Sequence, residues 1–260
     1  MKFTLMTVGG IAFIFLMTVL GAALVFCFKK EISSRLNAVF LGLASGIMIA
    51  ASVWSLLLPA FEQAEKSWGK YTFIPIAIGL LLGAAFLFFF DRLLPLSKEK
   101  IASQKPRRLF IAMTLHNIPE GLAAGFAFGT AYAIGTPAVF ASTVGLAIGL
   151  GIQNFPEGAA TALPMRSALK SRGKAFLLGV ISGIPELLFS VLGFFLASQL
   201  IAWQPWLLAF SAGAMLYVVA EDLLPDSKLS AEQADLKFAP IATWSFMLGF
   251  ILMMILDVVL

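Results

Sequence analysis

The chain has 260 residues, of which 60% are hydrophobic and 12% are charged, and its mean hydropathy is +0.95. A water-soluble domain carries about 25% charged residues, so this composition excludes that class of protein. The net charge of +4 does not indicate a nucleic-acid partner, because most basic residues lie in short segments between apolar runs. The single cysteine, Cys27, excludes an internal disulfide bond and a cysteine-rich metal site.

Continuous apolar runs predict that the chain crosses the lipid bilayer as helices of about 20 residues each. The first run, from Leu5 to Phe28, is too long for a cleavable signal peptide and is predicted to be a retained helix. The uncharged stretch from Gly121 to Pro156 is too long for one crossing and divides near Gly135. We expect one transmembrane domain, residues 1–260, with eight helices at residues 5–28, 36–61, 72–90, 108–129, 138–163, 174–200, 204–222 and 240–259.

The basic residues predict the orientation of these helices. All but three of the 18 Lys and Arg residues fall in loops on one side, and the exceptions are Lys2, Lys66 and Lys70. Because cytoplasmic loops are enriched in Lys and Arg, we expect a multi-pass protein of the plasma (inner) membrane with both termini outside the cytoplasm. The cytoplasmic set comprises Lys29, Lys30, Arg35, Arg92, Lys98, Lys100, Lys105, Arg107, Arg108, Arg166, Lys170, Arg172, Lys174, Lys228 and Lys237.

Two of the expected helices share a short sequence pattern. The second contains Ser45-Gly46-Ile47-Met48 and ends in Leu57-Leu58-Pro59, and the seventh contains Ala212-Gly213-Ala214-Met215 and ends in Leu223-Leu224-Pro225. These two helices run in opposite directions, as in transporters built from inverted repeats. The sequence therefore predicts an all-α membrane fold in a 3+2+3 arrangement, with helices one to three and six to eight repeating around helices four and five. Coincidence among apolar residues is the alternative.

Polar motifs interrupt the central helices. The fourth contains His116-Asn117-Ile118-Pro119-Glu120-Gly121, the fifth contains Gln153-Asn154-Phe155-Pro156-Glu157-Gly158, and the sixth contains Pro185-Glu186. Residues three and four apart share a helix face, so His116, Asn117 and Glu120 project together, as do Gln153, Asn154 and Glu157. Two such faces meeting would gather an imidazole, carboxamides and carboxylates in one volume. These side chains predict a metal site, because ionisable groups in a membrane require a partner or a function.

Alternatives to a metal site stay open from the residues alone. Glu120 and Glu157 could be protonated acids in a relay, which would make the protein a proton-coupled carrier of a small solute. An intramembrane metalloenzyme is the other alternative, although a zinc hydrolase helix offers two histidines and this chain has one. Glu186 could be structural, and Met48 on the second helix could serve packing.

The two motifs, in this order and within eight expected helices, resemble those of the ZIP (Zrt/Irt-like) metal transporters of bacterial type. The resemblance covers essentially the whole chain. It implies a divalent metal transporter and no enzyme, with zinc uptake foremost and Fe²⁺, Mn²⁺, Co²⁺ and Cd²⁺ as further ions. It implies alternating access, in which helices one, four, five and six rearrange against the rest. It also implies a homodimer, and the metal is cargo rather than a cofactor.

The resemblance also implies residue roles. One ion would be held by Met48, His116, Glu120, Gln153 and Glu157, and a second by Asn117, Glu120, Asn154, Glu157 and Glu186. Many relatives have histidine where Gln153 stands, and some bacterial ones have aspartate where Asn154 stands, so the second position carries less negative charge here. Glu221 and Asp222 correspond to cytoplasmic exit ligands, with a solvated helix end as the alternative.

Overall fold

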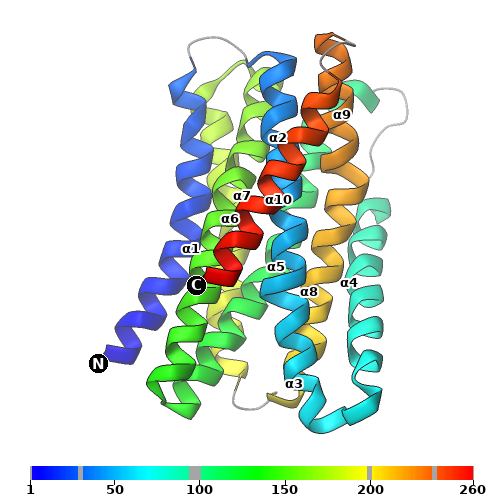
Figure 1. Ribbon diagram of the computed structural model, residues 1–260. Coiled ribbons are helices and arrows are strands. Elements are labelled where there is room, and N and C mark those ends of the chain that lie inside the picture. The colour runs from blue at the N-terminus through cyan, green and yellow to red at the C-terminus, as the bar shows by residue number, and fades with distance from the viewer. Residues whose placement is uncertain (1, 29–31, 94–100, 198–200, 236–238, 260) are drawn as a thin grey trace.

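The computed structural model describes residues 2–28, 32–93, 101–197, 201–235 and 239–259. This described part of the chain is entirely helical, which confirms the all-α prediction (Figure 1). The α-helices are α1 (Lys2–Cys27), α2 (Ser34–Ala51), α3 (Leu58–Trp68), α4 (Phe73–Leu93), α5 (Ile101–Ile134), α6 (Pro137–Leu169), α7 (Arg172–Leu196), α8 (Gln204–Val218), α9 (Leu224–Ala234) and α10 (Pro240–Val259).

Two long helices each contain a wide π-helical turn in the middle. Ser52–Leu57 joins α2 to α3, and Val219–Leu223 joins α8 to α9. In both, the residue after the turn donates its N–H five residues back, and a proline follows at Pro59 or Pro225. The turns thus occur at equivalent places in the two helices that share the predicted pattern. π-Turns inside α-helices are rare and frequently lie at functional sites.

These two helices extend beyond their predicted ends at residues 61 and 222. α3 continues to Trp68 because Ala60 and Ala64 are buried, while its charged residues face outward. α9 continues to Ala234 because it packs on α2, where Ser227 Oγ donates to the Ala38 carbonyl at 2.8 Å. Charged residues therefore marked the edge of the apolar core rather than the end of a helix.

Most of the basic residues that were expected in loops and that the structure describes lie within helices, because the helices run past their predicted ends: Arg35, Arg92, Lys105, Arg107, Arg108, Arg166, Arg172, Lys174 and Lys228. Arg166, expected in a loop, lies within α6, is 6% exposed and donates to the Val25 carbonyl at 3.4 Å. The apolar stem of arginine allows such burial when its nitrogens find acceptors. Among the other residues of the cytoplasmic set, Lys29, Lys30, Lys98, Lys100 and Lys237 lie outside the described ranges.

Gly135 and Pro137 mark the turn between the two central helices, α5 and α6, where the sequence predicted it. Gly135 adopts φ +70, a left-handed conformation that suits glycine, and Pro137 begins α6. Among the described residues, seven helical stretches are long and apolar enough to cross a membrane. α5 is not one of the seven, because the polar residues and prolines of its motif dilute its apolar character.

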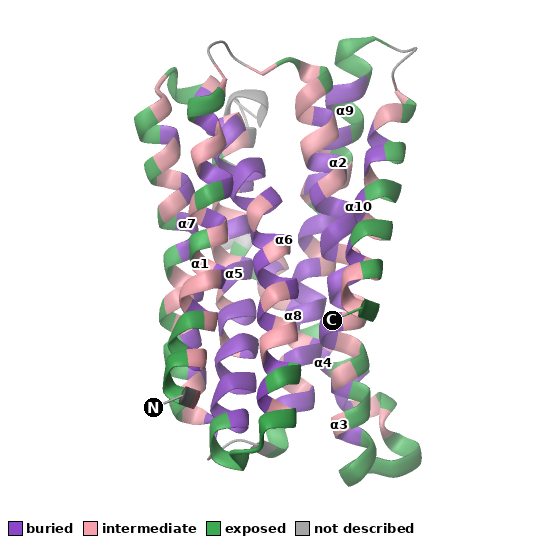
Figure 2. Cartoon of the chain, turned by 60° about the vertical axis from the view of Figure 1, so that its left-hand side comes forward, coloured by how far each residue is buried: buried purple, intermediate pink, exposed green. Residues whose placement is uncertain are grey.

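The helices pack in two groups. α1 packs along α6 and α5 along α7, whereas α2 packs along α10 and α4 along α8. Glycines make these contacts close: a Cβ on Gly158 would lie 2.1 Å from the Thr18 carbonyl oxygen, and one on Gly46 would lie 2.0 Å from that of Phe246. Figure 2 shows buried residues gathered in the middle of the bundle and exposed ones on its outer faces. The motifs of α5 and α6 therefore lie inside the bundle, away from lipid.

Candidate metal centre

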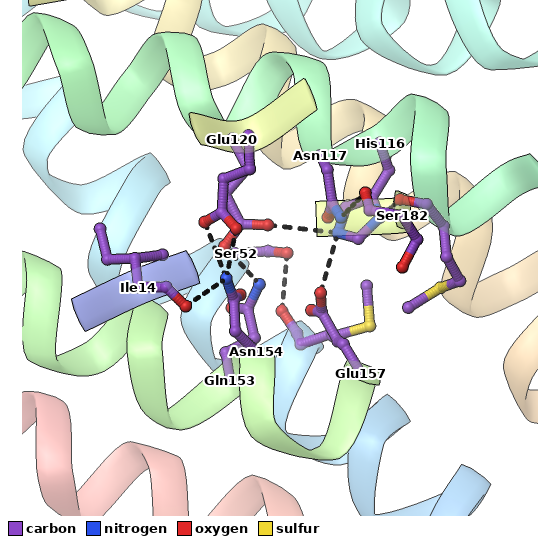
Figure 3. Close-up of polar contacts among 12 residues, drawn as sticks. Ile14, Ser52, His116, Asn117, Glu120, Gln153, Asn154, Glu157 and Ser182 are labelled. Carbon is purple, nitrogen blue, oxygen red and sulfur yellow. Dashed lines mark hydrogen bonds and ion pairs between the residues drawn. The ribbon is translucent and has the colours of Figure 1, made fainter. Parts of the chain in front are cut away.

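The central site is formed where α5 and α6 cross the middle of the bundle. Each helix contains a proline inside its motif, Pro119 in α5 and Pro156 in α6. A proline cannot donate to the carbonyl four residues earlier, so each motif has a weakened turn. His116, Asn117 and Glu120 of α5 face Gln153, Asn154 and Glu157 of α6, and all six are buried (Figure 3). The structure thus brings together the two faces that helical spacing predicted.

His116 is held with its outer nitrogen aimed at two carboxylates. Its Nδ1 lies 3.0 Å from the Met113 carbonyl oxygen, which can only accept, so Nδ1 is the donor in this contact and Nε2 is the nitrogen that a neutral imidazole offers to a metal ion. Nε2 is 3.3 Å from Glu120 Oε2 and 3.3 Å from Glu157 Oε2. Tetrahedral ligands about 2.0–2.2 Å from a zinc ion are separated by about 3.3–3.5 Å. The three side chains therefore have the spacing of ligands to one ion, within a cluster whose ligand atoms all lie within 4.8 Å of one another.

The carboxamides of the motifs bind the carboxylates through their N–H groups. Gln153 Nε2 donates to Glu120 Oε1 at 3.0 Å. Asn154 Nδ2 donates to both oxygens of Glu186 at 2.7 Å. A carboxyl group offers an accepting oxygen in its ionised and in its protonated form. These bonds therefore fix the positions of the Glu120 and Glu186 carboxyl groups relative to α6.

Several buried oxygens of the site have no hydrogen-bond partner among the described residues. They include Asn117 Oδ1, Gln153 Oε1, Asn154 Oδ1 and Glu157 Oε1. Buried polar atoms are normally satisfied, so a cluster of unpartnered acceptors needs an explanation. A divalent cation would satisfy the oxygen acceptors and His116 Nε2 together, and it would balance the negative charge of ionised carboxylates. The donor set, one imidazole with carboxylate and amide oxygens, suits zinc and its first-row neighbours.

Glu186 contacts a motif residue, whereas Met48 is linked by a hydrogen bond only to Ser52 of its own helix. Glu186 on α7 is 1% exposed and is tied to α6 through Asn154. Met48 is fully buried on α2, one turn before the π-helical segment, and its carbonyl accepts a hydrogen bond from Ser52 Oγ at 2.7 Å. The π-helical turn that begins at Ser52, drawn with the motif residues in Figure 3, packs against α6, and Met48 precedes that turn.

Glu221 and Asp222 lie apart from the central cluster, in the π-helical turn between α8 and α9. Glu221 is exposed and Asp222 is half-buried. Asp222 borders a small cavity that is also lined by Leu115 of α5, the residue before His116, and by Tyr217 of α8. The structure therefore places one of the two predicted exit residues next to the helix that carries the site.

Sequence reasoning missed a second polar contact inside the bundle. Ser55 Oγ, in the other π-helical turn, donates to Asp257 Oδ1 of α10 at 2.6 Å. Both face Gly149 of α6, one turn before Gln153. A lone aspartate in the last apolar run was a signal for this contact, but its partner and its proximity to α6 depend on how the helices pack.

The sequence is similar to those of known proteins. A family model described as "ZIP Zinc transporter" matches residues 98–257. Zinc transporter ZIP11 of Homo sapiens is 34% identical over 96% of this chain and 95% of its own length. Zinc transporter GufA of Myxococcus xanthus is 34% identical over 88% of this chain and 89% of its own, and Zinc transporter ZIPB of Bordetella bronchiseptica is 34% identical over 95% and 78%.

These matches confirm the family that the two motifs predicted. The names of the family and of the relatives indicate transporters rather than enzymes, as expected. Since the family model covers more than half of the chain and the relatives extend over most of it, the chain belongs to the ZIP family of zinc transporters.

Proposed function

We propose that this protein carries zinc into the cytoplasm through a two-metal centre between α5 and α6. The observation that carries the proposal is the position of His116 Nε2, 3.3 Å from one oxygen of Glu120 and 3.3 Å from one oxygen of Glu157. All three groups are buried, and a buried cluster of this charge is stable only with a cation or with protons. The ligands include no thiolate, so binding can be weak enough to reverse.

The two ions divide the site between them. The first is held by Met48, His116, Glu120, Gln153 and Glu157, and the second by Asn117, Glu120, Asn154, Glu157 and Glu186. Support comes from the carboxamide oxygens of Gln153, Asn117 and Asn154, which have no partner among the described residues. Asp222 and Glu221 receive the ion on the cytoplasmic side. Fe²⁺, Mn²⁺, Co²⁺ and Cd²⁺ compete for the same ligands, because these ions differ in preferred geometry more than in ligand type.

Transport proceeds by alternating access, in which α1, α5, α6 and α7 move together against the remaining helices. The close backbone contacts of glycine support this division, because they join helices within a group. Gly149 of α6 is the exception that faces the other group, and its neighbours are side-chain atoms 3.2–3.5 Å from a built Cβ. When one group of helices moves against the other, side-chain contacts of this kind can rearrange more easily than close backbone contacts.

The topology completes the proposal, with α5 as the eighth crossing in a 3+2+3 arrangement. In an inverted repeat, predicted helices one to three (α1, α2 and α4) correspond to helices six to eight (α7, α8 and α10), and α6 corresponds to α5. The α2–α10 pair then corresponds to the α8–α4 pair, and the α1–α6 pair corresponds to the α7–α5 pair. All four pairs pack extensively. Gly46 and Gly213 of the shared pattern both meet a backbone carbonyl, of Phe246 and Leu80. The basic loops then lie in the cytoplasm, both termini lie outside it, and the plasma membrane holds a homodimer.

Zinc flux into proteoliposomes tests this function. The protein is reconstituted, and Zn²⁺ uptake is followed with a dye inside the vesicles, with and without an imposed membrane potential. We expect uptake that rises with an inside-negative potential, since each charge moved gains about 2.3 kcal/mol per 100 mV. Uptake is lost in Glu120→Ala and Glu157→Ala and is retained in Glu62→Ala, an exposed residue of α3.

The same vesicles separate the alternatives. Solute-dependent proton flux without metal flux would favour the relay, and zinc binding that persists unchanged in both glutamate variants would refute the metal centre. Competition by Mn²⁺, Fe²⁺, Co²⁺ and Cd²⁺ in the uptake assay ranks the ions. Flux measured from either face of oriented vesicles gives the direction.

A further inference from the structure

The two motifs make similar contacts with the helices that pack beside them, α5 with α7 and α6 with α1. Asn117 Nδ2 of α5 donates to the Ser182 carbonyl of α7 at 2.7 Å. Asn154 Nδ2 of α6 lies 3.4 Å from the Ile14 carbonyl of α1, to which it donates (Figure 3). The equivalent asparagines of the two motifs therefore bind equivalent carbonyls on two flanking helices.

One turn further along each flanking helix, the equivalence continues. A Cβ on Gly121, at the end of the α5 motif, would lie 2.3 Å from the Glu186 carbonyl oxygen. A Cβ on Gly158, at the end of the α6 motif, would lie 2.1 Å from the Thr18 carbonyl oxygen. Thr18 thus occupies on α1 the position that Glu186 occupies on α7, four residues after the carbonyl that accepts from an asparagine.

The hydroxyl of Thr18 is buried and has no partner. Thr18 is 1% exposed, and its Oγ1 makes no hydrogen bond to any described residue. A threonine in a helix ordinarily donates to the carbonyl four residues earlier, as Thr143 does to Val139 at 2.9 Å. For Thr18 that carbonyl belongs to Ile14, which already accepts from Asn154. The Thr18 side chain packs against α7, where its Cγ2 lies 3.1 Å from a Cβ built on Gly183, three residues before Glu186.

We propose that Thr18 is a further ligand of the second metal position, where its hydroxyl binds the ion from α1 as Glu186 does from α7. The inference rests on the proposed two-metal centre and adds one oxygen to it. A hydroxyl is neutral, so it completes coordination without adding to the charge of Glu120, Glu157 and Glu186. An ion bound partly by neutral oxygens leaves more readily than one bound by a fourth carboxylate, which suits a transported cargo.

The test compares Thr18→Val, which keeps the shape and removes the hydroxyl, with Thr18→Ser, which keeps the hydroxyl. Thr143→Val is the matched control, because it removes a buried hydroxyl that is bonded within its own helix. Zn²⁺ binding to the purified protein in detergent is measured by calorimetric titration. In Thr18→Val we expect the second equivalent to bind about tenfold more weakly, a loss typical of a supporting metal contact, and the first equivalent to be unchanged. Thr18→Ser and Thr143→Val bind both equivalents as the native protein does.

A second readout uses the metal-free protein. Replacing an unpartnered buried hydroxyl by a methyl group should not lower stability, so metal-free Thr18→Val melts at or above the native temperature, while its stabilisation by Zn²⁺ shrinks. Equal binding of the second equivalent by Thr18→Val and the native protein would overturn the inference, as would equal weakening in Thr143→Val. Thr18→Ala repeats the test if the valine variant misfolds. Native protein that binds no zinc would refute the proposed function instead.

Discussion

The α5–α7 flank of the metal centre and the α6–α1 flank have the same framework and different chemistry. Each motif has an asparagine that donates to a flanking helix, a glutamate after a proline, and a glycine against a backbone carbonyl. Yet His116 stands opposite Gln153, and Glu186 stands opposite Thr18. The backbone arrangement repeats, while α5 and α7 supply three titratable groups, His116, Glu120 and Glu186, and α6 supplies Glu157. The comparison teaches that a repeated backbone framework positions the side chains of both motifs and that the residues that differ between the motifs set the charge of the proposed site.

The largest loss of Zn²⁺ uptake is expected from the glutamate that both motifs contain. Glu120→Gln and Glu157→Gln each remove a carboxylate oxygen 3.3 Å from His116 Nε2, and both are proposed to bridge the two ions. We expect each to lower the initial rate of Zn²⁺ uptake by at least about a hundredfold, because charged ligands carry most of the binding. Glu65→Gln on the exposed face of α3 is the control. A loss in one variant only would show that the glutamates are not equivalent.

Exchanging His116 and Gln153, which differ between the two motifs, tests what each contributes to metal binding. His116→Gln makes the two motifs alike at this position, and we expect Zn²⁺ to bind about 10–100-fold more weakly, with a smaller loss for Mn²⁺, which prefers oxygen ligands. Gln153→His adds an imidazole on the other flank and should keep Zn²⁺ affinity at the native level or above. Titration of both ions into both variants is the measurement. Zn²⁺ affinity that survives in His116→Gln would remove His116 from the ligand set.

Gly121 and Gly158 test whether the α5–α7 and α6–α1 helix pairs are packed equally closely. A Cβ at Gly158 or Gly121 would lie within 2.3 Å of a backbone oxygen that cannot turn away, so alanine at either position should destabilise the protein by about 1–3 kcal/mol. Gly149→Ala, whose neighbours are side-chain atoms at 3.2–3.5 Å, should cost much less. Thermal unfolding in detergent reports all three. A Gly149→Ala loss as large as the others would contradict the division into two groups.

The smallest difference is expected between the two asparagines. Asn154 binds both Glu186 oxygens and the Ile14 carbonyl, whereas Asn117 binds the Ser182 carbonyl. Asn154→Ala leaves a buried carboxylate without this donor and should destabilise the metal-free protein by about 2 kcal/mol, against about 1 kcal/mol for Asn117→Ala. Denaturation of the two variants side by side decides this. The reverse order would indicate that Glu186 is held mainly by other groups.

Much of the fold followed from the sequence because apolar runs and helical spacing are local properties. Spacing alone placed His116 with Glu120 and Gln153 with Glu157 on shared faces, and Gly135 marked the turn between the helices. The extension of α3 to Trp68 was missed because small buried alanines, not apolar bulk, hold that part of the helix. Thr18 carried no signal at all, since a threonine in an apolar run is ordinary packing. Its meaning depends on the docking of α1 against α6, which no local pattern encodes.

The wide turns at Ser52–Leu57 and Val219–Leu223 have a consequence for how this protein tolerates mutation. Each is followed by a proline, Pro59 or Pro225, that has no N–H to give back to the turn. A main-chain oxygen in each turn therefore has no proline N–H from which to accept. No side-chain replacement can delete a main-chain oxygen. Exhaustive mutagenesis scored by zinc uptake should therefore find Pro59 and Pro225 intolerant of replacement although neither side chain is proposed to bind the ion, because at these positions the backbone rather than the side chain matters.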